Sequence, residues 1–159
     1  MMDAFLIWKW IHILSAAVLF GTGLGIAFFM LMAHRAGSPI LIAGVGRIVV
    51  VADFLFTATA VVVQPVSGIA LAVLAGYSLL DEWLLATYAL YVLIGCCWLP
   101  VVWIQWKMQK LAQHAADTNA DLPAQYHRLF AWWFWLGWPA FASVMAIYVL
   151  MLVRPAQVF

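Results

Sequence analysis

Four long apolar stretches take up most of this chain and constrain its fold more than any other feature. They span roughly residues 5–33, 47–75, 83–107 and 126–153. A helix needs about 20 apolar residues to cross the hydrocarbon core of a bilayer, and each stretch exceeds that length. The runs are continuous rather than alternating, which disfavours a membrane β-barrel. The sequence therefore predicts an all-α membrane protein, a four-transmembrane-helix bundle that forms a single domain over residues 1–159.

Composition points to the same class of protein. The chain is 69% hydrophobic and 8% charged, whereas soluble domains contain about 45–50% apolar and 25% charged residues. The lipid bilayer is the expected partner, and a net charge of +1 gives no reason to expect nucleic acid. Cys96 and Cys97 are adjacent, a spacing that suits neither a zinc site nor a structural disulfide.

The distribution of lysine and arginine predicts the orientation. Two longer connections are expected, at residues 34–46 and in the polar segment 109–125. With their flanks they carry five basic residues, Arg35, Arg47, Lys107, Lys110 and Arg128. The opposite side carries Lys9 and Arg154. Because positively charged loops stay in the cytoplasm, both termini are expected on the periplasmic side of a bacterial inner membrane, which the chain crosses several times.

His12 lies inside the first apolar stretch, where an ionisable side chain by default marks a functional site. It is expected about two turns below the surface. Polar residues of the other helices fall at a matching depth and predict a shared pocket; they are Gln64, Ser67, Thr87, Tyr88, Tyr91, Ser143 and Tyr148. His12 is then a haem iron ligand, a proton-relay group, or a buried imidazole bonded to Gln64 or a tyrosine. The sequence leaves these three interpretations open.

Polar residues also follow one face of the second stretch at three- and four-residue steps: Asp53, Thr57, Gln64 and Ser67. This face should look inward, because lipid cannot solvate it. Pro65 is expected to kink the helix and to free a backbone carbonyl. For Asp53 we expect an ion pair with Arg128, the alternative being a proton or ligand site.

The haem hypothesis assigns cofactor contacts to His12, Gln64, Tyr91 and Trp98. No second histidine lies at the depth of His12, so the iron would be five-coordinate or would take Met145, Tyr91 or a non-protein sixth ligand. The alternative position expected for a haem is between His34 and His127, at the cytoplasmic ends of their helices. The aromatic run at 130–139 could wall a flat cofactor such as a porphyrin or a quinone.

Three motifs resemble an uncharacterised bacterial family of predicted four-helix integral membrane proteins, over essentially the whole chain. They are W-K-x-x-H (Trp8, Lys9, His12), V-x-Q-P-x-x-G (Gln64, Pro65, Gly68) and W-L-P-V-V-W-x-Q (Trp98 to Gln105).

The layout also resembles, remotely, the HemJ-type protoporphyrinogen oxidases. The likeness lies in the Lys9–His12 helix, a stretch like that from Pro65 to Gly76, and positions Tyr126, Arg128, Phe130, Arg154 and Pro155. It implies a bundle that handles haem or a haem precursor. The lysine and histidine of the third helix of that family are replaced by Ala86–Thr87 and Trp98, and tryptophans precede Pro139 in place of Asn-Glu. The resemblance thus implies haem binding through His12 rather than the oxidase reaction.

Three functions follow from these features. The first is binding of haem b or a porphyrin with a redox role, in electron transfer to a quinone or a membrane partner; an enzyme would then be a haem-linked oxidoreductase. The second is a non-enzymatic subunit or assembly factor of a larger membrane complex, with helix contacts through Gly21, Gly25 and Gly68. The third is a small transporter, as a homo-oligomer.

Overall fold

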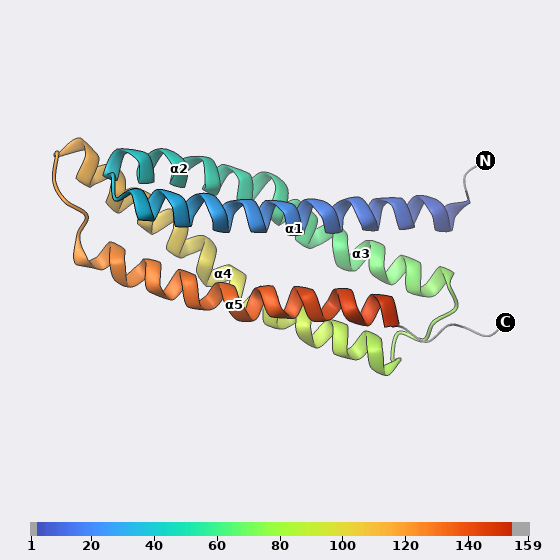
Figure 1. Ribbon diagram of the computed structural model, residues 1–159. Coiled ribbons are helices and arrows are strands. Elements are labelled where there is room, and N and C mark those ends of the chain that lie inside the picture. Colours follow the sequence, from blue (N-terminus) through green and yellow to red (C-terminus); the bar gives the residue numbers. More distant parts are fainter. Residues whose placement is uncertain (1–2, 154–159) are drawn as a thin grey trace.

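The computed structural model describes residues 3–153 and is a bundle of helices (Figure 1). The elements are α1 (Ala4–Ala36), α2 (Pro39–Ala52), the π-helix η1 (Asp53–Thr57), α3 (Ala58–Leu74), α4 (Glu82–Asp117) and α5 (Ala124–Val153). Because α2, η1 and α3 run on without a break, four helices are long and apolar enough to cross a membrane. No strand occurs within the described part. The predicted all-α bundle is confirmed, while Arg154 and Pro155 lie outside the described residues.

The helices run alternately up and down, so α1 begins and α5 ends at the same end of the bundle (Figure 1). We call this the terminus end. The connections between α1 and α2 and between α4 and α5 lie at the opposite end, which we call the loop end. Lipid-facing positions are covered by large apolar side chains, as Phe54 and Leu55 show with exposures of 68% and 60%.

The connection expected at residues 34–46 is mostly helical, so this prediction is wrong. Helix α1 ends at Gly37, whose φ of 70° suits a residue without a Cβ. Ser38 then caps α2 by accepting from the Leu41 N–H at 3.4 Å, and Pro39 takes the first helical position. Glycine and proline therefore mark a tight helix-to-helix turn here.

Helix α4 continues to Asp117, about three turns beyond the expected end at residue 107. The extension is amphipathic, because Met108, Ala112 and Ala115 recur at helical spacing and are all buried. The polar segment expected as a loop from residue 109 is thus reduced to the short connection between Asp117 and Ala124.

The hydrophobic core is concentrated toward the loop end. Its buried residues come from the half of each helix nearest that end, for example Met30, Ile42, Met108 and Trp133. At the terminus end the four helices instead surround a hollow. A Cβ built on Gly21 would meet no other atom within 4 Å, so this glycine makes no close helix contact inside the bundle.

Candidate functional site

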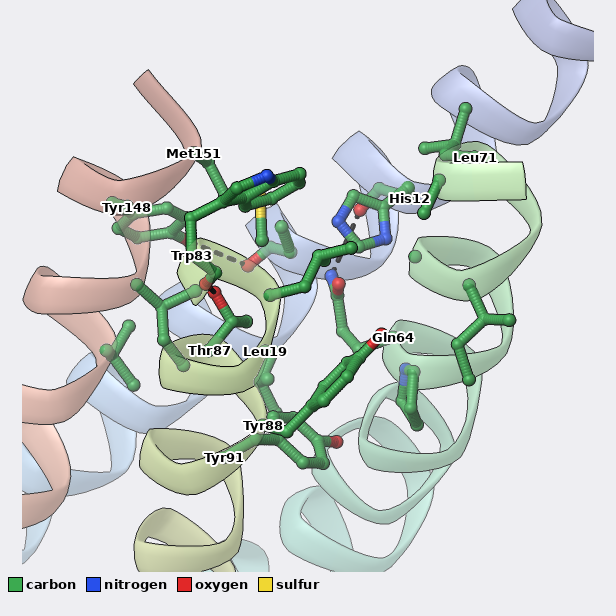
Figure 2. A pocket seen from close by; sticks show the side chains of 18 of the residues that line it. His12, Leu19, Gln64, Leu71, Trp83, Thr87, Tyr88, Tyr91, Tyr148 and Met151 are labelled. Carbon is green, nitrogen blue, oxygen red and sulfur yellow. Dashed lines mark hydrogen bonds between the residues drawn. The ribbon is translucent and has the colours of Figure 1, made fainter. Parts of the chain in front are cut away.

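A cavity of about 190 Å³ lies among the helices in the half of the bundle toward the terminus end (Figure 2). We call it the hollow. Four helices contribute to its wall, and its lining is mainly aromatic and aliphatic. Its lining includes His12 and Phe20 of α1, Gln64 and Gly68 of α3, Trp83, Tyr88 and Tyr91 of α4, and Tyr148 and Met151 of α5. Helical bundles commonly place cofactor sites in such a position, between facing helices.

His12 is held in one orientation by Ser67. Its Nδ1 lies 2.8 Å from the Ser67 Oγ, and that hydroxyl donates to the Val63 carbonyl one turn earlier, at 2.7 Å. When its single hydrogen is given to the Val63 or the Gln64 carbonyl, the hydroxyl accepts from His12 in the tautomer that carries the proton on Nδ1. The Nε2 lone pair is then left free to accept a proton or to bind a metal.

Gly68 and Gln64 complete the seat of this histidine. A Cβ on Gly68 would lie 3.3 Å from the Cε1 of His12, so the absence of a side chain lets the ring lie close to α3. The Gln64 amide donates to the His12 backbone carbonyl at 3.0 Å and ties α1 to α3. The side-chain partner of the imidazole is thus Ser67 and not a tyrosine, while Gln64 is bonded to His12, as expected, but through backbone groups.

Pro65 frees a carbonyl, as predicted, and Tyr91 takes it. A proline at position 65 leaves the Val61 carbonyl, four residues earlier, without its helical N–H partner. The Tyr91 hydroxyl on α4 donates to this oxygen. Tyr91 lines the hollow as expected, but its hydroxyl is engaged in joining α4 to α3.

The far wall contains two residues that the sequence analysis did not assign to the site. Met151 brings a thioether into the hollow, and Trp83 brings an indole (Figure 2). The Nε1 of Trp83 is buried and has no hydrogen-bond partner among residues 3–153. Trp83 resembles an interfacial anchor in sequence. Only its place on the same face of α4 as Thr87, one turn on, points to the pocket.

A second polar cluster surrounds Asp53, which is 3% exposed. Its Oδ1 accepts from the Trp98 Nε1 at 3.3 Å. The Gln105 amide, oriented so that both its ends are satisfied, donates to Oδ2 at 2.7 Å and accepts from the Trp133 Nε1 at 3.2 Å. Asp53 thus joins three membrane-spanning segments through neutral donors.

This cluster differs from the expected ion pair of Asp53 with Arg128, because Arg128 is exposed on the first turns of α5. Trp98 belongs to the Asp53 cluster and does not line the hollow. Trp98 and Gln105 are seven residues apart on α4, a spacing that places both on one helix face and could have predicted their common target.

His34 and His127 form an aromatic cluster at the loop end. Their ring centroids are 5.9 Å apart and meet edge to face. Phe130 stacks on His34 at 3.5 Å, and Tyr126 lies 3.4 Å from its Nδ1. Phe130 therefore covers one face of His34, and Tyr126 lies against its Nδ1. No group of three metal-ligating side chains occurs in the part of the chain that the structure describes.

The structure thus brings His12, Gln64 and Tyr91 together and separates Trp98 from them. The polar residues predicted to face inward from the α2–η1–α3 segment are all buried: Asp53, Thr57, Gln64 and Ser67. Met145, proposed as a sixth ligand, does not line the hollow, whereas Met151 does. The arrangement offers a lone pair at one wall, a free N–H donor at another and aromatic faces between them.

Comparison with known proteins agrees with the membrane fold. No curated protein and no solved structure matches the chain. The pattern of the family described as "Predicted integral membrane protein (DUF2269)" matches residues 6–155, nearly the whole length. The chain therefore belongs to this family of predicted integral membrane proteins.

Proposed function

We propose that this protein binds a b-type haem, or a related porphyrin, in the hollow and serves electron transfer in a bacterial inner membrane. The seat of His12 carries the proposal, because Ser67 holds Nδ1 at 2.8 Å and leaves Nε2 free. Histidines that ligate metals almost always have the other ring nitrogen fixed by a hydrogen bond in this way. The termini would face the periplasm, as the basic residues predict.

The donors that line the hollow fit a haem. His12 and Met151 would hold the iron through an imidazole nitrogen and a thioether, which are both donors that haem proteins use. Phe20 and Tyr88 add aromatic surface on which a flat ring can lie. When bound, haem supplies one-electron redox chemistry. The protein's residues fix the histidine, surround the ring with apolar side chains and exclude water.

The volume of the hollow limits how much of a porphyrin it can enclose. About 190 Å³ is below the roughly 300–1,000 Å³ of common ligand sites. The hollow is partly open, so a macrocycle would extend into that opening as well as the enclosed space. Helices α3 and α4 are joined near the site by the Tyr91 hydroxyl bond and by the short connection between Leu74 and Glu82.

The test is an absorption spectrum of protein purified in mild detergent, before and after dithionite and after addition of haemin. We expect a Soret band with sharpened α and β bands on reduction, lost in His12→Ala. His114→Ala is the matched control, because His114 is exposed near the end of α4. A folded protein whose spectrum does not change with haemin would overturn the haem site and would favour the subunit hypothesis or a smaller ligand.

The size of the hollow favours one second candidate, the head group of a quinone. A quinone ring is much smaller than a macrocycle, and its carbonyl oxygens are acceptors that suit the free Trp83 N–H. Binding of a soluble quinone analogue would quench tryptophan fluorescence in the wild type, and the quenching would be lost in Trp83→Phe. Saturable quenching by a protein that ignores haemin would favour this candidate.

A further inference from the structure

We infer that the hollow binds the reduced quinol form of a quinone in preference to the oxidised form, through a hydroxyl that donates to His12. The inference rests on the second candidate function, the quinone head group, and names the redox form that the site takes. A quinone oxygen can only accept a hydrogen bond, whereas a quinol hydroxyl can donate as well as accept. A haem iron on His12 would occupy the same ring nitrogen, so the two ligands are alternatives for one site.

The first observation is an acceptor on the α1 wall. The Ser67 hydroxyl donates to the Val63 or the Gln64 carbonyl and is therefore available to accept from the His12 Nδ1. The imidazole also bonds to the Gln64 backbone, whose carbonyl can only accept. Both neighbours favour a proton on Nδ1, so Nε2 faces the hollow as a lone pair (Figure 2). A ligand O–H satisfies this lone pair, and a ligand carbonyl does not.

The second observation is a donor on the α4 wall. The Nε1 of Trp83 is buried and has no hydrogen-bond partner within residues 3–153. An indole nitrogen is a donor only, and a buried donor without an acceptor is costly and rare in native proteins. Tyr77 packs against the indole edge to face, with ring centroids 5.2 Å apart, and the Thr87 hydroxyl donates to the Trp83 backbone carbonyl. A ligand oxygen would therefore complete the bonding of an indole that packing already holds.

The third observation is that these two groups share one small space. His12 and Trp83 point into the hollow from α1 and α4 at about the same level (Figure 2). The volume of about 190 Å³ suits a single six-membered ring better than a macrocycle. A ring with oxygen atoms at opposite edges can then present one oxygen to each wall. The oxygen near Trp83 accepts and the oxygen near His12 donates, which is a combination that a quinol provides.

The lining also favours an uncharged ligand. No Asp, Glu, Lys or Arg is among the described residues that line the hollow, so a charged group would lose its hydration without gaining a counter-charge. The Tyr91 and Tyr148 hydroxyls are bonded to backbone carbonyls, of Val61 and Ala16, which leaves their rings as apolar surface. A phenolic hydroxyl stays protonated at neutral pH, as that of tyrosine does. The quinol is therefore neutral, like the wall that surrounds it.

The experiment compares trimethylhydroquinone with trimethylbenzoquinone, which have the same ring and differ by two hydrogen atoms. Both are titrated into detergent-purified full-length protein by calorimetry without oxygen, so that the reduced form persists. We expect the wild type to bind the hydroquinone about tenfold more tightly, because the quinone would place an acceptor against the Nε2 lone pair.

Three variants assign the preference to its source. His12→Phe keeps a ring but removes the lone pair, so the two forms should bind equally. Trp83→Phe removes a donor that serves an oxygen of either form, so both affinities should fall by a similar factor and the preference should remain. Trp138→Phe, at an exposed position of α5, is the control and should change neither affinity. A mere change of shape would not alter the ratio of the two affinities in one variant and spare it in the other.

The outcomes separate this inference from the functions on which it depends. Equal binding of the two forms by the wild type, or tighter binding of the quinone, would overturn the inference and leave the quinone candidate standing. A preference that survives in His12→Phe would also overturn it. Binding of neither form would overturn the quinone candidate as well, while the haemin titration decides the haem site separately. The wild-type comparison needs no variant, so a misfolded variant would not prevent a decision.

Discussion

Gly68 lies against the imidazole of His12, so closely that a Cβ on the glycine would stand 3.3 Å from the ring Cε1. This contact is tighter than ordinary van der Waals packing and involves a ring that Ser67 already holds. The position of the histidine therefore depends on the absence of a side chain on α3 as much as on the hydrogen bond that orients it.

Replacing Gly68 with alanine should displace the ring and weaken its bond to Ser67. We expect Gly68→Ala to bind haem at least tenfold more weakly in a Soret titration, because small misplacements of a ligand lose much of its affinity. Gly95→Ala is the control, since a Cβ there meets nothing within 4 Å. In that variant, haem binding should be unchanged and stability should rise by about 0.5–1 kcal/mol. Equal haem affinity in both variants would contradict this account.

Replacing Ser67 with alanine should free the imidazole without changing the shape of the wall. Loss of an outer-shell partner of a ligating histidine commonly costs about 10–100-fold in metal affinity. We expect a loss of that size in Ser67→Ala, measured by haemin titration. Ser143→Ala should have no such effect, because the Ser143 hydroxyl donates to the Pro139 carbonyl within its own helix. An unaltered affinity in Ser67→Ala would show that the bond does not position the ring.

The hydrogen bond from Tyr91 to the Val61 carbonyl should contribute more to the free energy of unfolding when Pro65 is present than when it is absent. Tyr91→Phe leaves a partly buried carbonyl of a membrane-spanning segment unpaired, and we expect a loss of about 1–3 kcal/mol in unfolding free energy. In the Pro65→Ala background the helix can supply an N–H to that carbonyl, so the same change should cost less. A double-mutant cycle of unfolding in mixed detergent measures this coupling. Strictly additive effects would contradict it.

Replacing Asp53 with asparagine, its uncharged isostere, should destabilise the Asp53 cluster. Asn at position 53 can still accept from Trp98, but its NH₂ group would face the Gln105 amide nitrogen. If Gln105 then turned over, it would lose its bond from Trp133. We expect Asp53→Asn to cost about 1–3 kcal/mol, and less in the Trp133→Phe background, where Gln105 can turn over freely. Thermal unfolding of the four proteins tests this, and an equal cost in both backgrounds would count against the network.

The sequence predicts the spans well, because about 20 apolar residues in a row have few alternatives to crossing a bilayer. It misplaces the ends of helices at the loop end. There, Gly37 and Pro39 act as a helix stop and a helix start rather than as marks of a long loop. The amphipathic end of α4 has a polar sequence and is predicted as a loop, although Met108 and Ala112 are buried there.

The site is predicted only in part, for a related reason. Counting residues fixes the depth of a side chain, and depth alone brings His12, Gln64 and Tyr91 to one level. It does not fix rotation about the helix axis or the choice between a ring and a backbone acceptor. The partners Ser67 for the imidazole and Val61 for Tyr91 depend on those details. Whether Trp83 and Met151 line the hollow depends on how the faces of α4 and α5 pack together.

The π-helix from Asp53 to Thr57 has a consequence for how this chain tolerates changes of length. The Ala58 N–H bonds to the Asp53 carbonyl five residues back, so this turn accommodates one residue more than an α-helical turn. Removing one residue from this turn would restore a regular helix and keep the segments on either side close to their present phase, so Asp53 would keep Trp98 and Ser67 would keep His12. The same deletion in α3, before Ser67, would instead rotate Ser67 by about 100° away from His12. The extra residue of the π-helix thus makes this short segment a place where a change of length leaves the angular relation between the two polar layers of the bundle intact.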